Sequence, residues 1–175
     1  MSDRYSARPD RVCLMTRTGP PPQQILDGFA VSFAVACAFF TDPAGQVLIV
    51  KPNYRDYWQF VGGMVDRGES PHDACAREVK EEIGLDVPVG GLLVLDWEQH
   101  NEFVAGPMSV YVFDAGVIDD RDAIRLQENE LEKFDFLPPE AAAPRFAAAN
   151  RARIGLAVEA RRAGRTVYQP SRPPL

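Results

Sequence analysis

The segment GMVDRGESPHDACAREVKEEIGL, residues 63–85, carries most of the information about the fold and the chemistry of this chain. Its second half predicts a helix from Ser70 to Ile83. Ser70 is a favourable N-cap, Pro71 suits the first turn of a helix, and Gly84 suits the position at which a helix stops. The glycines before this helix predict a tight loop that a ligand can approach closely.

Three carboxylates lie on one face of the predicted helix. Successive helical residues turn by about 100°, so Glu78, Glu81 and Glu82 are neighbours, and like charges at these spacings repel each other. One interpretation is an ordinary solvated acidic face. The other is a site for a hard divalent cation, which prefers oxygen ligands, and the adjacent glycine loop favours it. The opposite side carries the apolar residues expected in the core, Ala76, Val79 and Ile83.

Two further charged residues connect the loop to the helix. Glu69 comes just before the N-cap, within reach of the helix start, and Arg77 stands among the acidic residues of the helix. We therefore expect an ion pair between Glu69 and Arg77.

The whole segment resembles the Nudix box, whose pattern is G-x5-E-x7-R-E-U-x-E-E-x-G-U, with U an aliphatic residue. A match at so many fixed places is much more specific than a lone glycine motif. The resemblance implies an α+β Nudix fold, in which a mixed β-sheet is sandwiched between α-helices, and a pyrophosphohydrolase that acts on acid anhydrides. Every fixed position is matched, by Gly63, Glu69, Arg77, Glu78, Val79, Glu81, Glu82, Gly84 and Leu85.

The resemblance also implies roles for individual residues. Glu78 and Glu82 would be the main ligands of a divalent cation, and the carbonyl of Gly63 would contribute a further contact. Glu81 would be a ligand or a catalytic residue, with simple solvation of the helix face as the alternative. Mg²⁺ is the implied cofactor, and Mn²⁺ can take its place. Glu69 and Arg77, the partners of the expected ion pair, would have a structural role.

An acidic segment beyond the box, ENELEKFDFLPPE at residues 128–140, offers one more carboxylate. Many members of the family carry such a group on a loop just before a late strand. We expect Glu130 to be an additional metal ligand or the catalytic general base, with Glu128 as the second choice. The alternative is an acidic loop with no role in the chemistry.

The rest of the chain predicts one domain with extensions. We expect an N-terminal arm over residues 1–26, the hydrolase domain over 27–165, and a frayed Pro-rich tail over 166–175. The Ala-rich segment 139–163 predicts a helix in one or two pieces. The apolar runs at residues 29–40 and 47–50 predict a hairpin. Strands are expected at residues 29–40, 47–50, 57–61, 92–98, 108–113 and 134–137.

Composition narrows the classes of partner and the environment. A net charge of -6 gives no electrostatic footprint for a nucleic-acid polymer, and no apolar run is long enough to span a membrane. Cys13, Cys37 and Cys75 show no metal-binding spacing, so we expect reduced thiols in a cytoplasmic protein. Homodimers are common in the family, which makes a homodimer one option here.

The substrate is predicted only as a class. The stretch from His100 to Phe103 lacks the Pro or Tyr that marks two subgroups of the family, so we expect a nucleoside diphosphate-linked compound or a nucleoside triphosphate. One alternative is a catalytically silent module that binds a nucleotide and regulates another protein; a related isomerase is another. Residues that would either contact the substrate or serve as surface or core are Lys51, Arg55, Arg67, Tyr54, Tyr57, Trp97 and Phe103.

Overall fold

The computed structural model describes residues 19–99 and 104–170. Contacts divide the chain between Val31 and Ser32, five residues after the end of the predicted arm. In the first unit, the described part contains the short helix α1 (Gln23–Leu26), whose Ile25 and Leu26 are exposed. The second unit carries all the other helices and strands of the described residues.

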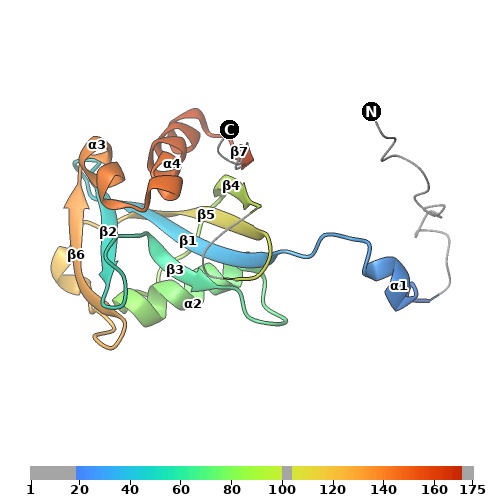
Figure 1. The fold of residues 1–175 in the computed structure, drawn as a ribbon. Coiled ribbons are helices and arrows are strands. Elements are labelled where there is room, and N and C mark those ends of the chain that lie inside the picture. Colours follow the sequence, from blue (N-terminus) through green and yellow to red (C-terminus); the bar gives the residue numbers. More distant parts are fainter. Residues whose placement is uncertain (1–18, 100–103, 171–175) are drawn as a thin grey trace. The chain divides into compact units, whose positions relative to one another are not determined.

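A single mixed sheet of seven strands forms the centre of the second unit (Figure 1). Its order is β6-β2-β1-β5-β4-β7, and β3 pairs with β1. The pairs β1–β5 and β4–β7 are parallel and the remaining pairs are antiparallel. The strands are β1 (Phe33–Thr41), β2 (Val47–Pro52), β3 (Val61–Met64), β4 (Leu92–Glu98), β5 (Met108–Val117), β6 (Leu131–Leu137) and β7 (Val167–Pro170).

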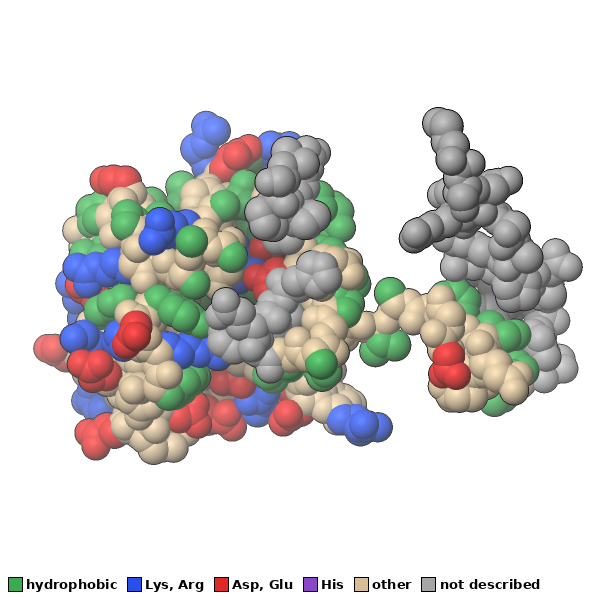
Figure 2. All heavy atoms as spheres, in the orientation of Figure 1, with side chains coloured by type: hydrophobic (Ala, Val, Ile, Leu, Met, Phe, Trp, Pro, Cys, Tyr) green, Lys and Arg blue, Asp and Glu red, His purple; other side chains and the backbone are tan. Residues whose placement is uncertain are grey.

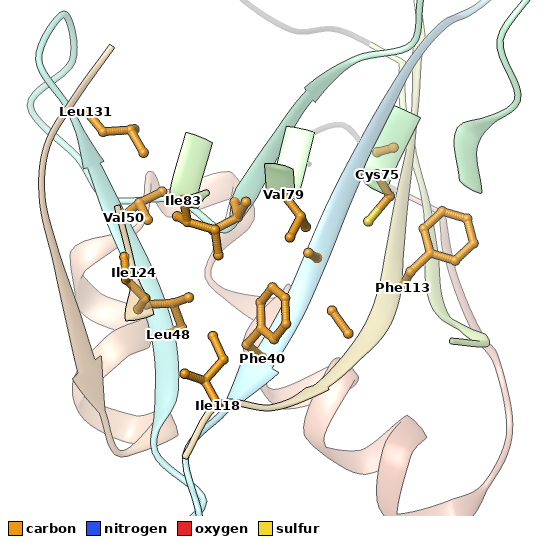
Figure 3. Close-up of a cluster of buried hydrophobic side chains, with 14 of the residues drawn as sticks. Phe40, Leu48, Val50, Cys75, Val79, Ile83, Phe113, Ile118, Ile124 and Leu131 are labelled. Atoms are coloured by element: carbon orange, nitrogen blue, oxygen red, sulfur yellow. The ribbon is translucent and has the colours of Figure 1, made fainter. Parts of the chain in front are cut away.

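Helices cover both faces of this sheet, which confirms the predicted α+β sandwich. Helix α2 (Pro71–Ile83) packs on one face, where Val79 and Ile83 point toward apolar side chains of β1 and β2 (Figure 3). Helices α3 (Pro139–Ala142) and α4 (Ala152–Ala163) contribute to the core on the other face. Because both faces are buried, the central strands consist mainly of apolar residues.

The ends of α2 follow the predicted capping. The Ser70 hydroxyl accepts a hydrogen bond from the Asp73 amide at 3.2 Å, and Gly84 ends the helix with a φ of 71°. The interpretation of an ordinary solvated acidic face is wrong for Glu82, which is 3% exposed. The core face also differs from the prediction, because Ala74 and Cys75 are buried there while Ala76 is only partly buried.

The predicted hairpin between the first two strands is correct only at its closed end. The β1–β2 register contains a single pair, Thr41 with Val47, because β3 pairs with Val35–Ala38 along the rest of β1. The first strand begins at Phe33 rather than at residue 29, since pairing with β5 starts at Met108. The strand predicted at 57–61 lies further along the chain, as β3.

The C-terminal part also differs from the prediction. The frayed tail is wrong for Val167–Pro170, which pairs in parallel with the open edge of β4; a proline is tolerated at the end of an edge strand. The Ala-rich segment is broken into more than two pieces. Besides α3 and α4, it contains the 3₁₀ turns η3 (Ala143–Arg145) and η4 (Ala148–Asn150), and another such turn, η2 (Arg121–Ala123), precedes β6.

Two of the three cysteines are described, and both are free thiols: Cys37 in β1 and Cys75 in α2. Cys13 lies outside the described residues. Among the helices that the structure describes, none is both long and apolar enough to cross a membrane.

Candidate functional site

A cavity of about 310 Å³ lies beside β1 and β3. Side chains reach it from both layers of helices: Glu78 and Glu82 come from α2, and Arg153 comes from α4 on the other side of the sheet. The cavity therefore has an acidic wall, formed by Glu78 and Glu82, and another wall that contains an arginine. The remaining lining residues are Val35, Cys37, Tyr54, Arg55, Gln59, Phe60, Gly62, Gly63, Met64, Met108, Val110, Glu130, Phe146 and Asn150.

Glu82 is the most buried carboxylate of the acidic wall. Its Oε2 accepts a hydrogen bond of 2.7 Å from the amide of Gly62, which ties α2 to β3. Burial raises the pKa of Glu82 to about 8, and the negative charges of Glu78 and Glu130 act in the same direction. The charged form of Glu82 is therefore unfavourable here unless a positive charge lies beside it.

Glu78 stands one helical turn from Glu82 and packs directly against the glycine loop. A Cβ added to Gly63 would lie 2.3 Å from Oε1 of Glu78, so only glycine fits this position without displacing the carboxylate. Burial raises the pKa of Glu78, although its carboxylate accepts a hydrogen bond of 2.7 Å from Arg77 Nη1.

Arg77 connects the loop, the helix and the acidic wall. Its Nε donates to Glu69 at 3.0 Å, so the ion pair expected from the sequence is present, and its Nη2 donates to the Met64 carbonyl at 3.0 Å. This guanidinium lowers the pKa of Glu69. Its Nη1 also donates to Glu81 at 3.0 Å, which directs Glu81 toward Arg77.

Glu130 reaches the cavity from the turn before β6. The Gln127 amide donates to the Glu82 carbonyl at 3.0 Å, and the Glu130 amide donates to the Gln127 carbonyl at 2.9 Å. These backbone bonds fasten the turn to the end of α2 and so place Glu130 on the same cavity as Glu82. Glu128, the second choice from the sequence, is exposed and is not part of the cavity.

The structure thus brings together four of the predicted site residues, Gly63, Glu78, Glu82 and Glu130, on one cavity. It does not bring Glu81 there; the Glu81 side chain is 51% exposed. Of the residues considered for substrate contact, Tyr54 and Arg55 line the cavity, and Phe103 lies outside the described residues. Sequence reasoning missed Phe146, Asn150 and Arg153, because an Ala-rich segment with scattered polar residues gives no motif.

The chemistry of the acidic wall fits a divalent cation. Three carboxylates share one cavity, and hard cations such as Mg²⁺ take oxygen ligands of this kind. In the part of the chain that the structure describes, no three acidic, histidine or cysteine side chains converge on one point. Glu78 instead contacts Arg77 Nη1 at 2.7 Å.

Charged side chains of both signs lie on the outer surface. Acidic and basic side chains are interspersed over the face drawn in Figure 2. Several of the basic residues are paired with acids, as in the contact of Lys51 Nζ with Glu132 at 3.9 Å and that of Arg145 with Asp135 at 3.5 Å.

Comparisons with known proteins bear on the family and the fold. The family model described as NUDIX domain matches residues 32–156. The chain is 41% identical over 73 residues to an RNA pyrophosphohydrolase of Psychrobacter cryohalolentis, which covers 41% of this chain and 40% of that protein. The match therefore spans less than half the length of this relative.

Two solved structures show the same fold. The MutT protein from Methanosarcina mazei Go1 has a TM-score of 0.61 and 22% identity, covering 77% of this chain and 96% of that chain. The solution structure of the Escherichia coli ORF135 protein has a TM-score of 0.61 and 24% identity, covering 83% and 98%. At these identities the likeness establishes the fold alone.

Proposed function

The chain belongs to the NUDIX family, and from this we propose that it is a hydrolase that cuts a pyrophosphate bond in a nucleoside di- or triphosphate derivative with the help of a divalent cation. The observation that carries the proposal is that Glu78, Glu82 and Glu130 line one cavity beside a glycine loop. Names of relatives support the bond type: the Psychrobacter protein is an RNA pyrophosphohydrolase.

We assign the cation to Glu78 and Glu82, together with the Gly63 carbonyl. A divalent cation supplies neutralisation of phosphate oxygens and activation of water when it is bound. Mg²⁺ suits the all-oxygen ligand set and Mn²⁺ is a natural substitute. Without such a partner, the buried charge of Glu82 is unfavourable, as its raised pKa indicates.

Glu130 is our candidate for the general base. It lines the cavity, and Gln127 Nε2 donates to its Oε1 at 3.3 Å, which orients the carboxylate without neutralising it. A carboxylate in this position can accept the proton of the attacking water. Glu81, the other base suggested by the sequence, shares its oxygen with Arg77, and we give it a supporting role in orienting that arginine.

Arg77 and Glu69 hold the glycine loop against helix α2. Arg77 holds the loop through the Met64 carbonyl and through Glu69, and it holds the helix through Glu78. Since these bonds fix both the glycine loop and a carboxylate of the acidic wall, we propose that the pair acts on catalysis only by positioning other groups.

The test is a hydrolysis assay with nucleoside triphosphates, sugar nucleotides, ADP-ribose and dinucleoside polyphosphates, with Mg²⁺, with Mn²⁺ and with chelator. We expect a metal-dependent release of pyrophosphate or a nucleoside monophosphate, and its loss in Glu82→Gln. No turnover of any substrate with either metal, combined with measurable nucleotide binding, would replace this proposal by the silent regulatory module.

A further inference from the structure

The cavity contains a second polar group that the hydrolytic chemistry does not use. Arg153 is 7% exposed, and its Nε donates to Asp96 Oδ2 at 2.8 Å while its Nη2 donates to Glu98. Both acids lie on β4 and are themselves buried. Of the three residues, Arg153 is the one that forms part of the cavity wall.

A purely structural role explains this cluster poorly. Burying ionised groups is costly, and a buried ion pair can often be replaced by apolar residues without loss of stability. Among the described residues, Asp96 Oδ1 is the buried side-chain oxygen that lacks any hydrogen-bond partner, which adds to the cost. We take this unfavourable burial, together with the place of Arg153 on the cavity wall, as a sign that the cluster binds a ligand.

The two carboxylates also fix what Arg153 can bind. They occupy Nε and one hydrogen of Nη2, and no hydrogen bond from Nη1 to another described residue is present. One arginine with two carboxylates has a net charge of -1, so this wall repels a further anion. The free donors therefore suit a neutral group that carries hydrogen-bond acceptors.

The surrounding walls suit a flat ring. Phe60 and Phe146 contact each other edge to face with centroids 5.0 Å apart, and Met108 and Val110 provide apolar surface beside them. A volume of about 310 Å³ lies in the range of small-ligand sites. An aromatic ring with polar atoms only on its edge matches a cavity with one polar wall.

We propose that Arg153, positioned by Asp96 and Glu98, recognises the base of the nucleotide and favours a purine with a 6-keto group, a proposal that rests on the function proposed above. Guanine and hypoxanthine offer two adjacent acceptors, O6 and N7, which an arginine fork binds through two nitrogens. Adenine replaces O6 by an amino group, which turns a donor toward the donors of Arg153.

The test compares the binding of GMP, IMP and AMP in the presence of Mg²⁺ by isothermal titration calorimetry. Monophosphates contain no pyrophosphate bond, so binding is measured independently of hydrolysis. The variants are Arg153→Met, which removes the fork, and Arg153→Lys, which keeps the charge between the two acids if the apolar variant does not fold. Arg162→Met is the control, since Arg162 is an exposed residue of the same helix outside the cavity.

We expect GMP and IMP to bind about tenfold or more tightly than AMP. This ratio should approach one in Arg153→Met and should fall in Arg153→Lys, which lacks the planar fork, but should not change in Arg162→Met. An equal affinity for all three in the unmodified protein, or an unchanged ratio in a folded Arg153 variant, overturns the inference. The hydrolysis assay on the whole substrate panel separates the proposals: turnover without discrimination defeats only this inference, and discrimination without turnover of any substrate defeats only the proposed function.

Discussion

The carboxylate of Glu82, in helix α2, accepts a hydrogen bond of 2.7 Å from the backbone amide of Gly62, in strand β3. This bond joins the helix to the glycine loop and keeps Glu82 at the edge of the cavity, where it is 3% exposed. A carboxylate in such a place serves two purposes, since it fixes the loop and supplies a buried negative charge for a cation.

Glu82→Gln separates these two purposes. The amide oxygen of glutamine can still accept the Gly62 hydrogen bond, so we expect a folded protein, but the loss of the charge lowers kcat/KM by about 100-fold or more. The matched variant is Glu81→Gln, which changes the exposed acid bonded to Arg77 and should cost less than tenfold. Steady-state kinetics with Mg²⁺ measure both, and an equal loss in the two variants contradicts the assignment of Glu82 as the main ligand.

The stability of the metal-free protein should depend on pH through the same residue. Burial raises the pKa of Glu82 from 4.5 to about 8, so the folded protein binds a proton there that the unfolded chain releases. This stabilisation is complete below pH 4.5 and is lost as the pH rises through about 8. At about 1.4 kcal/mol per pKa unit, the loss is about 5 kcal/mol at most.

Urea denaturation with chelator at pH 5, 7 and 9 measures this effect. The unmodified protein should lose free energy of unfolding relative to Glu82→Gln as the pH rises, because glutamine does not ionise. Parallel pH dependences of the two proteins would show that Glu82 is not the group responsible.

Gly63→Ala tests the contact between the loop and the acidic wall. The new Cβ would lie 2.3 Å from Oε1 of Glu78, so the carboxylate must move, and we expect activity to fall by about tenfold or more while the fold survives. Gly91→Ala is the control, since a Cβ added there would meet no atom within 4 Å and its φ is not in the left-handed region. Kinetics and a melting curve for each variant distinguish a displaced ligand from a general loss of stability.

Much of the fold and part of the site follow from local patterns. The helix of residues 71–83 is specified by its caps, and the apolar runs identify most of the strands. The Glu69–Arg77 pair is equally local. In each case the signal lies in the residues themselves or in their near neighbours in the sequence.

Strand β7, the burial of Glu82 and the contacts of Arg153 depend on residues far apart in the sequence, and the spacing of apolar residues along the chain does not reveal such contacts. Residues 167–170 become a strand only because β4 has a free edge. Glu82 is buried rather than exposed because β3, and not β2, occupies most of the edge of β1 and places the Gly62 amide beside it. Arg153 meets Asp96 and Glu98 across more than fifty residues of sequence, so no motif could have connected them.

Glu130→Gln and Glu128→Gln form the pair that tests the general base. Both residues lie near the start of β6, but only Glu130 lines the cavity, whereas Glu128 is exposed. If Glu130 takes the proton of the attacking water, its replacement should lower kcat by about 100-fold or more with little change in KM, and should remove the acidic limb of the pH–rate profile. Glu128→Gln should leave kcat and the pH–rate profile unchanged, because its side chain reaches neither the cavity nor the carboxylates that line it.

A rise in the Mg²⁺ concentration needed for half-maximal rate, with kcat restored at saturating metal, would instead make Glu130 a ligand. An unchanged kcat and metal dependence in Glu130→Gln would remove this residue from the chemistry and leave Glu81 as the base to examine.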